Sequence, residues 1–500
     1  MTPLTRSILP SILPSTGVTV GRTPAGPERV MQFGEGNFLR AFVDWMFQEL
    51  IDRGLYDGRI VVVQPLENGM VAALNRQEGL YTVVQRGYEG GTLTERRNLI
   101  AAVSRGIDPY TRYEDFLAAA RNPDLRVIVS NTTESGIRYT ACERPAERCP
   151  ASFPAKVTAL LFERFTAFTG DPSKGMLIIP CELIERNGDE LKRCVLRHAE
   201  DWNCGGAFTA WVEGHCRFYN TLVDRIVPGF PKEEMAELTA QFGYRDDLLV
   251  ACEVFHKWVI QGHPDAQREL RFTEAGLNVV WTDDITPHRT LKVRILNGAH
   301  TTFTIPAYLA GKEFVKESME DELIGRFIRD AVGAEILPTL AFHEQEKIAF
   351  AEAVLERFRN PHIKHALLSI TLNTLSKYAV RVLPSLLEYH RLNGTVPARL
   401  SFGLAALIRF YRPAGTDANG SVGEYDGRRY PIQDVPEVLS AFRTLWETHG
   451  SDHAALAEAV LSRNDWWGTD LRNVSGLSAA VRQYLDRIAS GGIRNVIAHF

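Results

Sequence analysis

The first half of the chain alternates short apolar runs with amphipathic stretches, and this alternation is the feature that most restricts its fold. Five runs have the length and composition of buried strands: ERVMQF, RIVVVQP, LYTVVQRG, LRVIVSNTT and GMLIIPCEL. Helical patterns such as FLRAFVDWMFQELIDRG and PAKVTALLFERFTAF lie between them. Buried strands that alternate with helices predict an α/β domain whose sheet is mostly parallel and covered by helices on both faces.

The strand pattern fades after about residue 285, and long helical patterns replace it. The two clearest are NPHIKHALLSITLNTLSKYAVRVLPSLLEYH and PARLSFGLAALIRFY, followed by an expected loop, residues 412–427. Thr286 and Pro287 resemble a helix N-cap followed by proline at the first helical position. We therefore expect a first domain over residues 1–286 and a largely α-helical domain over residues 287–500.

Composition and charge exclude several classes of function. The net charge of −5 disfavours nucleic acid as a main partner, although a local basic pocket for a small anion remains compatible with it. No stretch approaches the roughly 18 uninterrupted apolar residues of a membrane span, and the N-terminus does not resemble a signal peptide. Seven cysteines without a CxxC pair favour reduced thiols in a cytoplasmic protein, and their scatter predicts no metal site.

A glycine turn follows the first expected strand, within FGEGNFLRAFVDW. Gly34 permits a tight turn, and Gly36 allows a phosphate to approach backbone N–H groups at the start of the next helix. The third glycine of a dinucleotide fingerprint is missing, so a turn without a ligand is an open alternative. The second strand ends in Gln64-Pro65 instead of an acidic residue, so these residues do not distinguish NAD from NADP.

Two further polar segments follow expected strands. SNTTESG, residues 130–136, stands where ligands bind in parallel sheets, but a hydrogen-bonded turn would give the same pattern. Asn187 and Gly188 end the segment IIPCELIERNG, and Asn-Gly is by itself a common turn. A catalytic Asn187 is therefore only one interpretation of this segment.

The segment LKVRILNGAH combines a helical pattern with three polar groups, Lys292, Asn297 and His300. We expect a helix over about residues 287–304 that Pro306 ends. At 100° per residue, Lys292 falls on the most apolar face, with Asn297 and His300 flanking it. The lysine either extends its amine to water or is desolvated and functional.

A desolvated lysine near the N-terminal end of a helix would have a pKa lowered from about 10.4 toward neutrality. Such an amine can exchange a proton with an alcohol or a carbonyl oxygen. The Asn297 amide can donate to an oxygen that gains negative charge, and His300 can orient a substrate hydroxyl. Together with a dinucleotide turn, these groups predict metal-free hydride transfer at a secondary alcohol.

The pattern K-x4-N-x2-H resembles the catalytic helix of the polyol-specific long-chain dehydrogenases, the mannitol dehydrogenase family. FGEGNFLRAFVDW resembles the cofactor turn of that family, and further similar stretches extend from residue 29 to about 412. The resemblance implies a zinc-independent, NAD-dependent enzyme with an N-terminal Rossmann domain, a helical C-terminal domain and a cleft site. Within the family it favours interconversion of D-tagaturonate and D-altronate.

The resemblance also implies roles for single residues. Lys292 matches the general acid/base, Asn297 and Asn187 match the amides that hold the oxyanion, and His300 matches a substrate-contacting histidine. Asp224 matches an aspartate near the site, whereas Arg289 stands where a mannitol dehydrogenase has a glutamate linked to proton escape. The expected cofactor contacts are Phe33, Gly34, Glu35, Gly36, Asn37, Phe38, Leu39, Arg40, Ser130 and Asn131.

A hexuronate carries a carboxylate, so its pocket should offer an arginine or lysine. Lys364, His365, Lys377 and Arg381 are available, and we favour Lys377 or Arg381, although each alone could be a solvated surface charge. The alternatives are reduction of fructuronate, dehydrogenation of a polyol, and a non-catalytic dinucleotide sensor. The substrate is expected to be a small sugar acid, and oligomeric state is left open.

Overall fold

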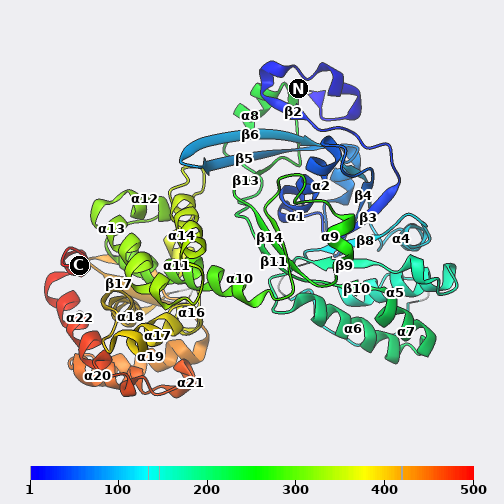
Figure 1. Cartoon of the computed structure of the whole chain (residues 1–500). Helices are drawn as coiled ribbons and strands as arrows, with labels where there is room; N and C mark the ends of the chain where they lie inside the picture. Colours follow the sequence, from blue (N-terminus) through cyan, green and yellow to red (C-terminus); the bar gives the residue numbers. More distant parts are fainter. Residues whose placement is uncertain (1, 133–134, 146, 418–419) are drawn as a thin grey trace. The chain divides into compact units, whose positions relative to one another are not determined.

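The computed structural model describes residues 2–132, 135–145, 147–417 and 420–500 (Figure 1). The chain forms two compact units, Met1–Thr286 and Pro287–Phe500. Buried apolar side chains form separate clusters in the two units, so each has a hydrophobic core of its own. A core of this kind is the basis of a separate domain.

A six-stranded sheet forms the centre of the first unit, and all its neighbouring strands run parallel. The strand order is β7-β4-β3-β8-β9-β10, which corresponds to the order 3-2-1-4-5-6 of a Rossmann sheet. The predicted fold class of this half is confirmed. The strands are β3 Glu28–Phe33, β4 Arg59–Val63, β7 Val103–Ile107, β8 Val127–Ser130, β9 Leu177–Pro180 and β10 Arg217–Phe218.

Helices cover both faces of this sheet, which explains why its strands are almost continuously apolar. Val30 of β3 belongs to the cluster that includes α2, whereas Met31 belongs to the cluster on the opposite face, with α4, α5, α6 and α7. The helices of this unit are α1 Asn37–Ala41, α2 Val43–Asp52, α3 Val71–Arg76, α4 Tyr113–Ala120, α5 Phe153–Ala167, α6 Asn187–Asp201, α7 Gly206–His215, α8 Met235–Phe242 and α9 Asp265–Glu269.

Three smaller sheets complete the first unit. The run LYTVVQRG forms most of β5, which pairs antiparallel with β6 instead of joining the parallel sheet, because apolar composition does not specify the pairing partner. The sheets are β13-β5-β6-β2, β11-β14-β15 and β1-β12. Their strands are β1 Thr2–Pro3, β2 Val18–Val20, β5 Tyr81–Glu89, β6 Thr92–Ile100, β11 Asn220–Asp224, β12 Tyr244–Arg245, β13 Val250–Cys252, β14 Lys257–Gln261 and β15 Val279–Thr282.

The second unit is largely helical, as predicted. Its central helix is made of α10 (Thr286–Leu291), a π-helical turn η4 (Lys292–Asn297) and α11 (Gly298–Leu309), and α11 packs against α15, α16 and α18. The other helices are α12 Val315–Glu320, α13 Glu322–Asp330, α14 Glu344–Phe358, α15 Leu367–Ile370, α16 Thr374–Arg381, α17 Leu383–Asn393, α18 Ala398–Phe410, α19 Pro436–His449, α20 His453–Leu461, α21 Asn464–Trp467, α22 Leu477–Gly491 and α23 Ile493–Ile497, with a second π-helical turn at Ala331–Ile336.

The expected end of the central helix at Pro306 is wrong, because α11 continues to Leu309. All twelve residues of α11 are buried, so packing on every side holds the helix although proline removes one backbone hydrogen bond. The carbonyl oxygen of Thr302, which loses that partner, faces Gly403 of α18, where a Cβ atom would be 3.2 Å away.

The pattern NPHIKHALLSITLNTLSKYAVRVLPSLLEYH is not one helix but three, α15, α16 and α17. Asn373 has a positive φ of 53° immediately before α16, and Pro384 lies in the first turn of α17. A residue with a positive φ does not continue an α-helix, and proline has no N–H to donate to the preceding turn, so the chain breaks before α16 and before α17.

The expected loop at residues 412–427 contains two strands. β16 (Pro413–Asp417) and β17 (Gly420–Tyr425) pair antiparallel, and β18 (Arg428–Pro431) adds a third strand. Residues 418 and 419 lie outside the described part of the chain. Glycine-rich composition suggested a loop here, but the pairing partners follow within ten residues and make a meander.

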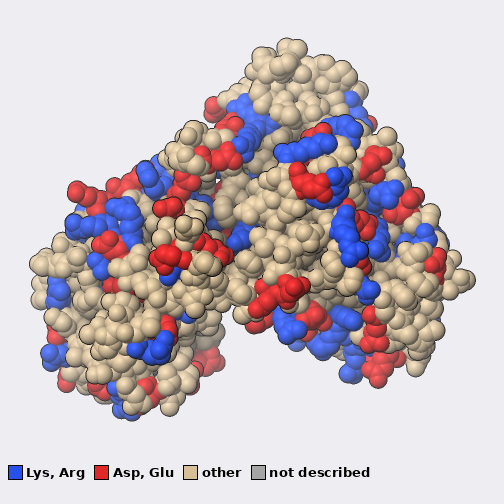
Figure 2. Space-filling view, viewed as in Figure 1, with Lys and Arg blue, Asp and Glu red and all other residues tan. Residues whose placement is uncertain are grey.

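Surface charge and thiols complete the description. Figure 2 shows acidic and basic side chains intermixed over the displayed face, in agreement with the moderate net charge. The seven cysteines are free thiols. Among the described residues, no helix is both long and apolar enough to span a membrane.

Candidate functional site

The glycine turn lies at the switch point of the Rossmann sheet, between β3 and β8. Gly34 has a φ of 118°, and a Cβ atom on it would be 2.9 Å from the main-chain oxygen of Asn131. The Asn131 N–H donates to the Phe33 carbonyl at 3.1 Å, which joins the ends of the two strands. The carboxyl ends of strands at such a switch point form the ligand crevice of open α/β sheets.

Gly36 begins the short helix α1 and leaves its backbone open. Its φ is −68°, it is exposed, and a Cβ atom there would meet no atom within 4 Å. Asn37 and Phe38 are half-buried beside it. The expected continuous helix is broken at Phe42, where α1 ends and α2 begins. The space above Gly36 fits the close approach of a pyrophosphate to main-chain N–H groups.

Other members of the predicted cofactor set are buried in the first unit. Phe33 and Leu39 belong to its core. The Arg40 guanidinium donates to the carbonyls of Glu35 and Leu248 and to Asn37 Oδ1. These three buried side chains therefore support the turn from the protein interior. They do not face the solvent-exposed side of Gly36.

Glu35 connects the turn to the loop that follows β4. Its Oε1 accepts a hydrogen bond from the Met70 N–H at 2.9 Å, and burial raises the pKa of its carboxyl. A cavity of about 750 Å³ lies beyond β4 and β7, lined by residues that include Gln64, Glu67 and Asn68. The cavity and the glycine turn thus both lie along the carboxyl edge of the parallel sheet.

Ser130 and Asn131 at the end of β8 contact the loop after β9. Ser130 Oγ donates to Glu182 at 3.0 Å, and Asn131 Nδ2 donates to the Cys181 carbonyl at 2.9 Å. Glu182 also accepts from the N–H and hydroxyl of Thr132, and burial raises its pKa. Glu182 was not predicted from the sequence, although it lies two residues after the apolar strand β9. Thr133 and Glu134 lie outside the described residues.

Asn187 is the first residue of α6 and does not form the expected Asn-Gly turn. Its side chain is fully buried, and Nδ2 donates to the carbonyls of Pro180 and Glu182 at 3.1 and 3.0 Å. Its Oδ1 accepts from the N–H groups of Gly188 and Thr221. The amide therefore ties α6 to β9 and to β11.

Asp224 ends β11, three residues after Thr221, and is 8% exposed. In the antiparallel pair with β14 it lies opposite Lys257. Asn187 and Asp224 thus belong to neighbouring elements of the first unit.

The π-helical turn changes the geometry that was expected for the catalytic helix. Residues five apart in a regular α-helix lie about 140° apart around the axis. A π turn closes its hydrogen bonds from i to i+5, so Lys292 and Asn297 come closer to one face than a regular helix allows. Both side chains are half-buried, not buried on the most apolar face.

His300 lies one turn further along, in a closed aromatic environment. Its ring centroid is 4.2 Å from that of Phe358 and 5.2 Å from that of His365. Burial, together with the charges of His365, Arg357 and Arg381, holds the pKa of His300 well below its ordinary value. The imidazole is therefore neutral, and its buried Nε2 has no hydrogen-bond partner among the described residues.

Arg381 lies beside this group at the end of α16. Its main-chain oxygen would be 3.0 Å from a Cβ atom on Gly298, so α16 and α11 touch at this point. Burial lowers the pKa of Arg381, and no ion pair to it is found in the described part of the chain. By contrast, Lys377 Nζ donates to the Ile370 carbonyl at 2.9 Å. Lys364 and His365 precede α15 and are not part of a helix.

The second unit therefore brings together four predicted residues: Lys292, Asn297, His300 and Arg381. Phe358 and Arg357 at the end of α14 complete the surroundings and were not selected from the sequence, because no motif links them to the central helix. Within the described residues, no group of three or more His, Cys, Asp or Glu side chains is arranged to hold a metal ion.

Sequence comparisons cover both units. The profile of the mannitol dehydrogenase Rossmann domain matches residues 28–274, and that of the mannitol dehydrogenase C-terminal domain matches residues 284–489. An altronate oxidoreductase of Cronobacter sakazakii is 46% identical over 476 residues, which are 94% of this chain and 96% of the relative. One of Escherichia coli O7:K1 is 45% identical, with 94% and 96% covered.

Two solved structures share the fold. A substrate-free D-sorbitol dehydrogenase matches with a TM-score of 0.80 and 21% identity, over 99% of this chain and 100% of that chain. The mannitol 2-dehydrogenase of Pseudomonas fluorescens, solved with NAD and D-mannitol, matches with a TM-score of 0.69 and 22% identity, over 100% and 99%.

Proposed function

We propose, since this chain belongs to the mannitol dehydrogenase family, that it is an NAD-dependent oxidoreductase that interconverts D-tagaturonate and D-altronate. The observation that carries the proposal is its near-full-length similarity to altronate oxidoreductases, which extends through both units. The substrate is a small sugar acid, and the reaction converts a keto carbon into a secondary alcohol.

The first unit is proposed to bind the dinucleotide at the turn from Gly34 to Phe38. The open backbone at Gly36 supports this assignment, because a pyrophosphate requires main-chain N–H groups without a side chain in front of them. NADH, when bound, supplies the hydride. Ser130, Asn131 and Glu182 would fix the neighbouring loops at the carboxyl ends of β8 and β9.

A preference for NAD over NADP is supported by the charges beyond β4. Arg105 is paired with Glu28 at 2.9 Å, and Arg112 is paired with Asp115 at 2.6 Å. A 2′-phosphate binds best to an arginine that is not already neutralised by a carboxylate. These two arginines of the cavity are engaged, so we assign the unphosphorylated cofactor.

Lys292 is proposed as the general acid that protonates the substrate oxygen during reduction, and as the base in the reverse direction. Asn297, brought toward the same face by the π turn, would donate to that oxygen while negative charge develops on it. His300 is neutral, so one ring nitrogen can accept and the other can donate a hydrogen bond. It is suited to orient a sugar hydroxyl.

Arg381 is the proposed partner of the substrate carboxylate. It is half-buried, close to His300, and able to make two parallel hydrogen bonds to a carboxylate. Lys377 is the weaker choice because its amine already donates to a backbone carbonyl. Asn187 is proposed as the second amide that donates to the oxyanion. For this, its Nδ2 would have to give up one of its hydrogen bonds to the carbonyls of Pro180 and Glu182. Asp224 is proposed to lie near the substrate, without an assigned role.

The decisive experiment follows NADH oxidation with D-tagaturonate, D-fructuronate and D-fructose as substrates, with and without chelator. We expect tagaturonate to give the highest kcat/KM and chelator to have no effect. Preference for fructuronate or for the uncharged ketose would contradict the substrate assignment, and the latter would favour a polyol dehydrogenase. NADH binding without turnover of any substrate would indicate a sensor.

We also propose a cytoplasmic location. The support is chemical, because seven unpaired thiols are compatible with a reducing compartment and NADH is a cofactor of intracellular metabolism. Cell fractionation with a tagged chain tests the location, and recovery outside the cytoplasm would contradict it.

A further inference from the structure

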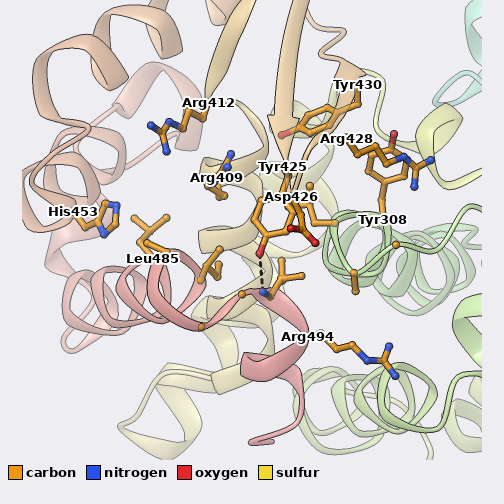
Figure 3. Close-up of a pocket in the computed structure, with 18 of the residues that line it drawn as sticks. Tyr308, Arg409, Arg412, Tyr425, Asp426, Arg428, Tyr430, His453, Leu485 and Arg494 are labelled. Carbon is orange, nitrogen blue, oxygen red and sulfur yellow. Dashed lines mark hydrogen bonds between the residues drawn. The ribbon is translucent and has the colours of Figure 1, made fainter.

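A second cavity lies in the helical unit, with a volume of about 690 Å³ (Figure 3). Its walls are the C-terminal end of α11, the hairpin of β17 and β18, and the ends of α22 and α23. The Tyr425 hydroxyl accepts a hydrogen bond from the Ile493 N–H at 2.8 Å, which connects the hairpin to α23. This hydrogen bond connects two walls of the cavity, the hairpin and the start of α23.

The cavity is strongly basic. Arg409, Arg412, Arg428 and Arg494 line it, and Asp426 is the only carboxylate among its lining residues, all of which are described. Figure 3 shows Arg409 and Arg412 on the same side of the cavity, with Arg428 and Arg494 elsewhere around it.

Two of the four guanidinium groups are already neutralised. Arg428 pairs with Glu313 at 3.1 Å, and Arg494 pairs with Asp321 at 2.9 Å. Both ion pairs are partly exposed, so they contribute little to the stability of the fold. They do hold the two arginine side chains in place. Arg428 and Arg494 are therefore not the strongest candidates for binding an anion.

Arg409 and Arg412 have no ion pair in the described part of the chain. Arg409 lies 4.9 Å over the Tyr425 ring and donates from Nη2 to the Glu424 carbonyl at 3.0 Å, while Arg412 lies 5.3 Å over the Trp446 ring. The aromatic rings hold both cations without neutralising them. The two positive charges are near enough to act on each other, because the charge of Arg412 lowers the pKa of Arg409.

Arg409 also carries a buried donor that is not used. Its Nη1 atom is inaccessible to solvent and has no hydrogen-bond partner among the described residues. Burial lowers the pKa of Arg409, the neighbouring Tyr430 and Tyr425 act in the opposite direction, and Arg412 adds to the lowering. Because Nη1 is closed to solvent, a ligand in the cavity would contact Arg409 through the part of this half-buried side chain that stays accessible.

We propose that this cavity binds a small-molecule phosphate monoester, with the phosphoryl group held between Arg409 and Arg412. A phosphate monoester carries a charge of about −1.5 to −2 at pH 7, which matches two unneutralised guanidinium groups better than the single charge of a sugar acid does. The volume lies within the range of small-molecule pockets and leaves space for the esterified group.

This site is separate from the proposed catalytic groups. Tyr308, in its wall, is eight residues after His300 on α11, which corresponds to about 12 Å along the helix axis. The proposal therefore does not depend on the proposed function, and it can fail or succeed independently of it.

Isothermal titration calorimetry with the full chain tests the site. Inorganic phosphate, glucose 6-phosphate and glucuronate are titrated with NADH present throughout, so that the glycine turn does not compete for phosphate. We expect saturable binding of glucose 6-phosphate and weaker binding of inorganic phosphate, whereas any binding of glucuronate should be insensitive to Arg412→Gln. Arg412→Gln should weaken phosphate binding at least about tenfold, as expected for loss of a charge-assisted hydrogen bond.

Arg391→Gln is the matched control, because Arg391 is an exposed arginine of the same unit that pairs with Glu388 on α17. It should bind phosphate like the wild type. Arg409→Lys keeps the charge but removes the fork of donors, and should weaken binding even if Arg409→Gln is poorly folded. Absence of saturable binding, equal effects of R412Q and R391Q, or an R412Q loss for glucuronate equal to that for glucose 6-phosphate would overturn the proposal.

Discussion

Lys292 and His300 illustrate how one helix can give similar polar residues different environments. His300 is enclosed by aromatic rings and kept neutral, whereas Lys292 is half-buried at the start of the π-helical turn. The residue types and their approximate neighbourhood could be predicted from the sequence. The degree of burial could not, because it depends on Phe358 and Arg357, which lie almost sixty residues further along the chain.

The role proposed for Lys292 has a direct kinetic test. Lys292→Ala should lower kcat by at least about 10²-fold, the usual contribution of a general acid or base, because water must replace the amine. NADH affinity should barely change. Lys316→Ala, which removes a half-buried lysine paired with Glu320, is the control and should retain wild-type kcat. Near wild-type turnover in K292A would exclude the mechanism.

Arg381 can be tested through substrate charge. Arg381→Gln should raise KM for tagaturonate by about tenfold or more, because a charge-assisted bidentate contact is lost. For an uncharged ketose the same substitution should leave kcat/KM almost unchanged. Lys377→Gln is the matched comparison and should have the smaller effect. A larger loss in K377Q than in R381Q would transfer the carboxylate contact to Lys377.

His256 predicts a pH-dependent stability. Burial, with the charges of Arg225 and Arg96, lowers the pKa of His256 to about 4, and its Nε2 accepts from the Asn278 N–H at 3.0 Å. The unfolded chain titrates near 6.5, so between pH 6.5 and 4 it binds a proton that the native state does not bind. The contribution of neutral His256 to stability is therefore present above about pH 6.5 and is lost as the pH falls toward 4.

Urea unfolding of wild type and His256→Gln at several pH values measures this effect. The wild-type free energy of unfolding should decrease relative to that of H256Q as the pH falls from 7 to 4. His215→Gln, which removes an exposed histidine of the same unit, should show no such divergence. Parallel pH profiles of wild type and H256Q would contradict the prediction.

At the scale of elements, the strands and the glycine turn could be predicted because their signals are local. An apolar run followed by Gly34 is sufficient to indicate a strand and a tight turn. The π-helical turn, the continuation of α11 through Pro306 and the breaks before α16 and α17 could not be predicted. Each results from packing against other elements, or from a local backbone state that the 3.6-residue period does not reveal.

Gly34 and Gly36 form a matched pair for testing the turn. Gly34→Ala should destabilise the protein by about 1–3 kcal/mol for two reasons. The methyl group would lie 2.9 Å from the main-chain oxygen of Asn131, and alanine would be held at a φ of 118°. Gly36→Ala should cost less than about 1 kcal/mol, since its φ is ordinary and its surroundings are open. Thermal or urea unfolding measures both changes.

NADH affinity then separates the two glycines by function. Gly36→Ala should weaken NADH binding in a folded protein, because its methyl group occupies the space through which the pyrophosphate would approach the backbone. Fluorescence titration measures the affinity. Unchanged NADH affinity in G36A would show that the turn is structural and binds no phosphate.

At the scale of the whole molecule, composition and pattern were sufficient to predict an α/β half followed by a helical half, and this fold class is confirmed. The pairing of β5 outside the parallel sheet and the hairpin after α18 were not predicted. Strand pairing depends on contacts between distant segments, whereas the hydrophobic pattern reports only which residues are buried.

The separate cores of the two units lead to a prediction about cofactor binding. NADH at about 100 times its Kd should stabilise the state that binds it by about 2.7 kcal/mol. Hydrogen exchange should therefore slow more in peptides from β3 and β8 than in peptides from α18 and α22. Mass spectrometry with and without NADH measures this difference. Uniform protection of both units would contradict a cofactor site confined to Met1–Thr286.

The π-helical turn also has a consequence for how the gene can change. A helix with one i→i+5 turn contains one residue more than a regular helix of the same span. Loss of a single codon within Lys292–Asn297 would restore regular winding over the same span and leave the turns on either side in place. A codon lost from α11 has no such extra residue to absorb it and would rotate one side of the helix by about 100° relative to the other, so this helix should accept a shortened gene at the π turn more readily than within α11.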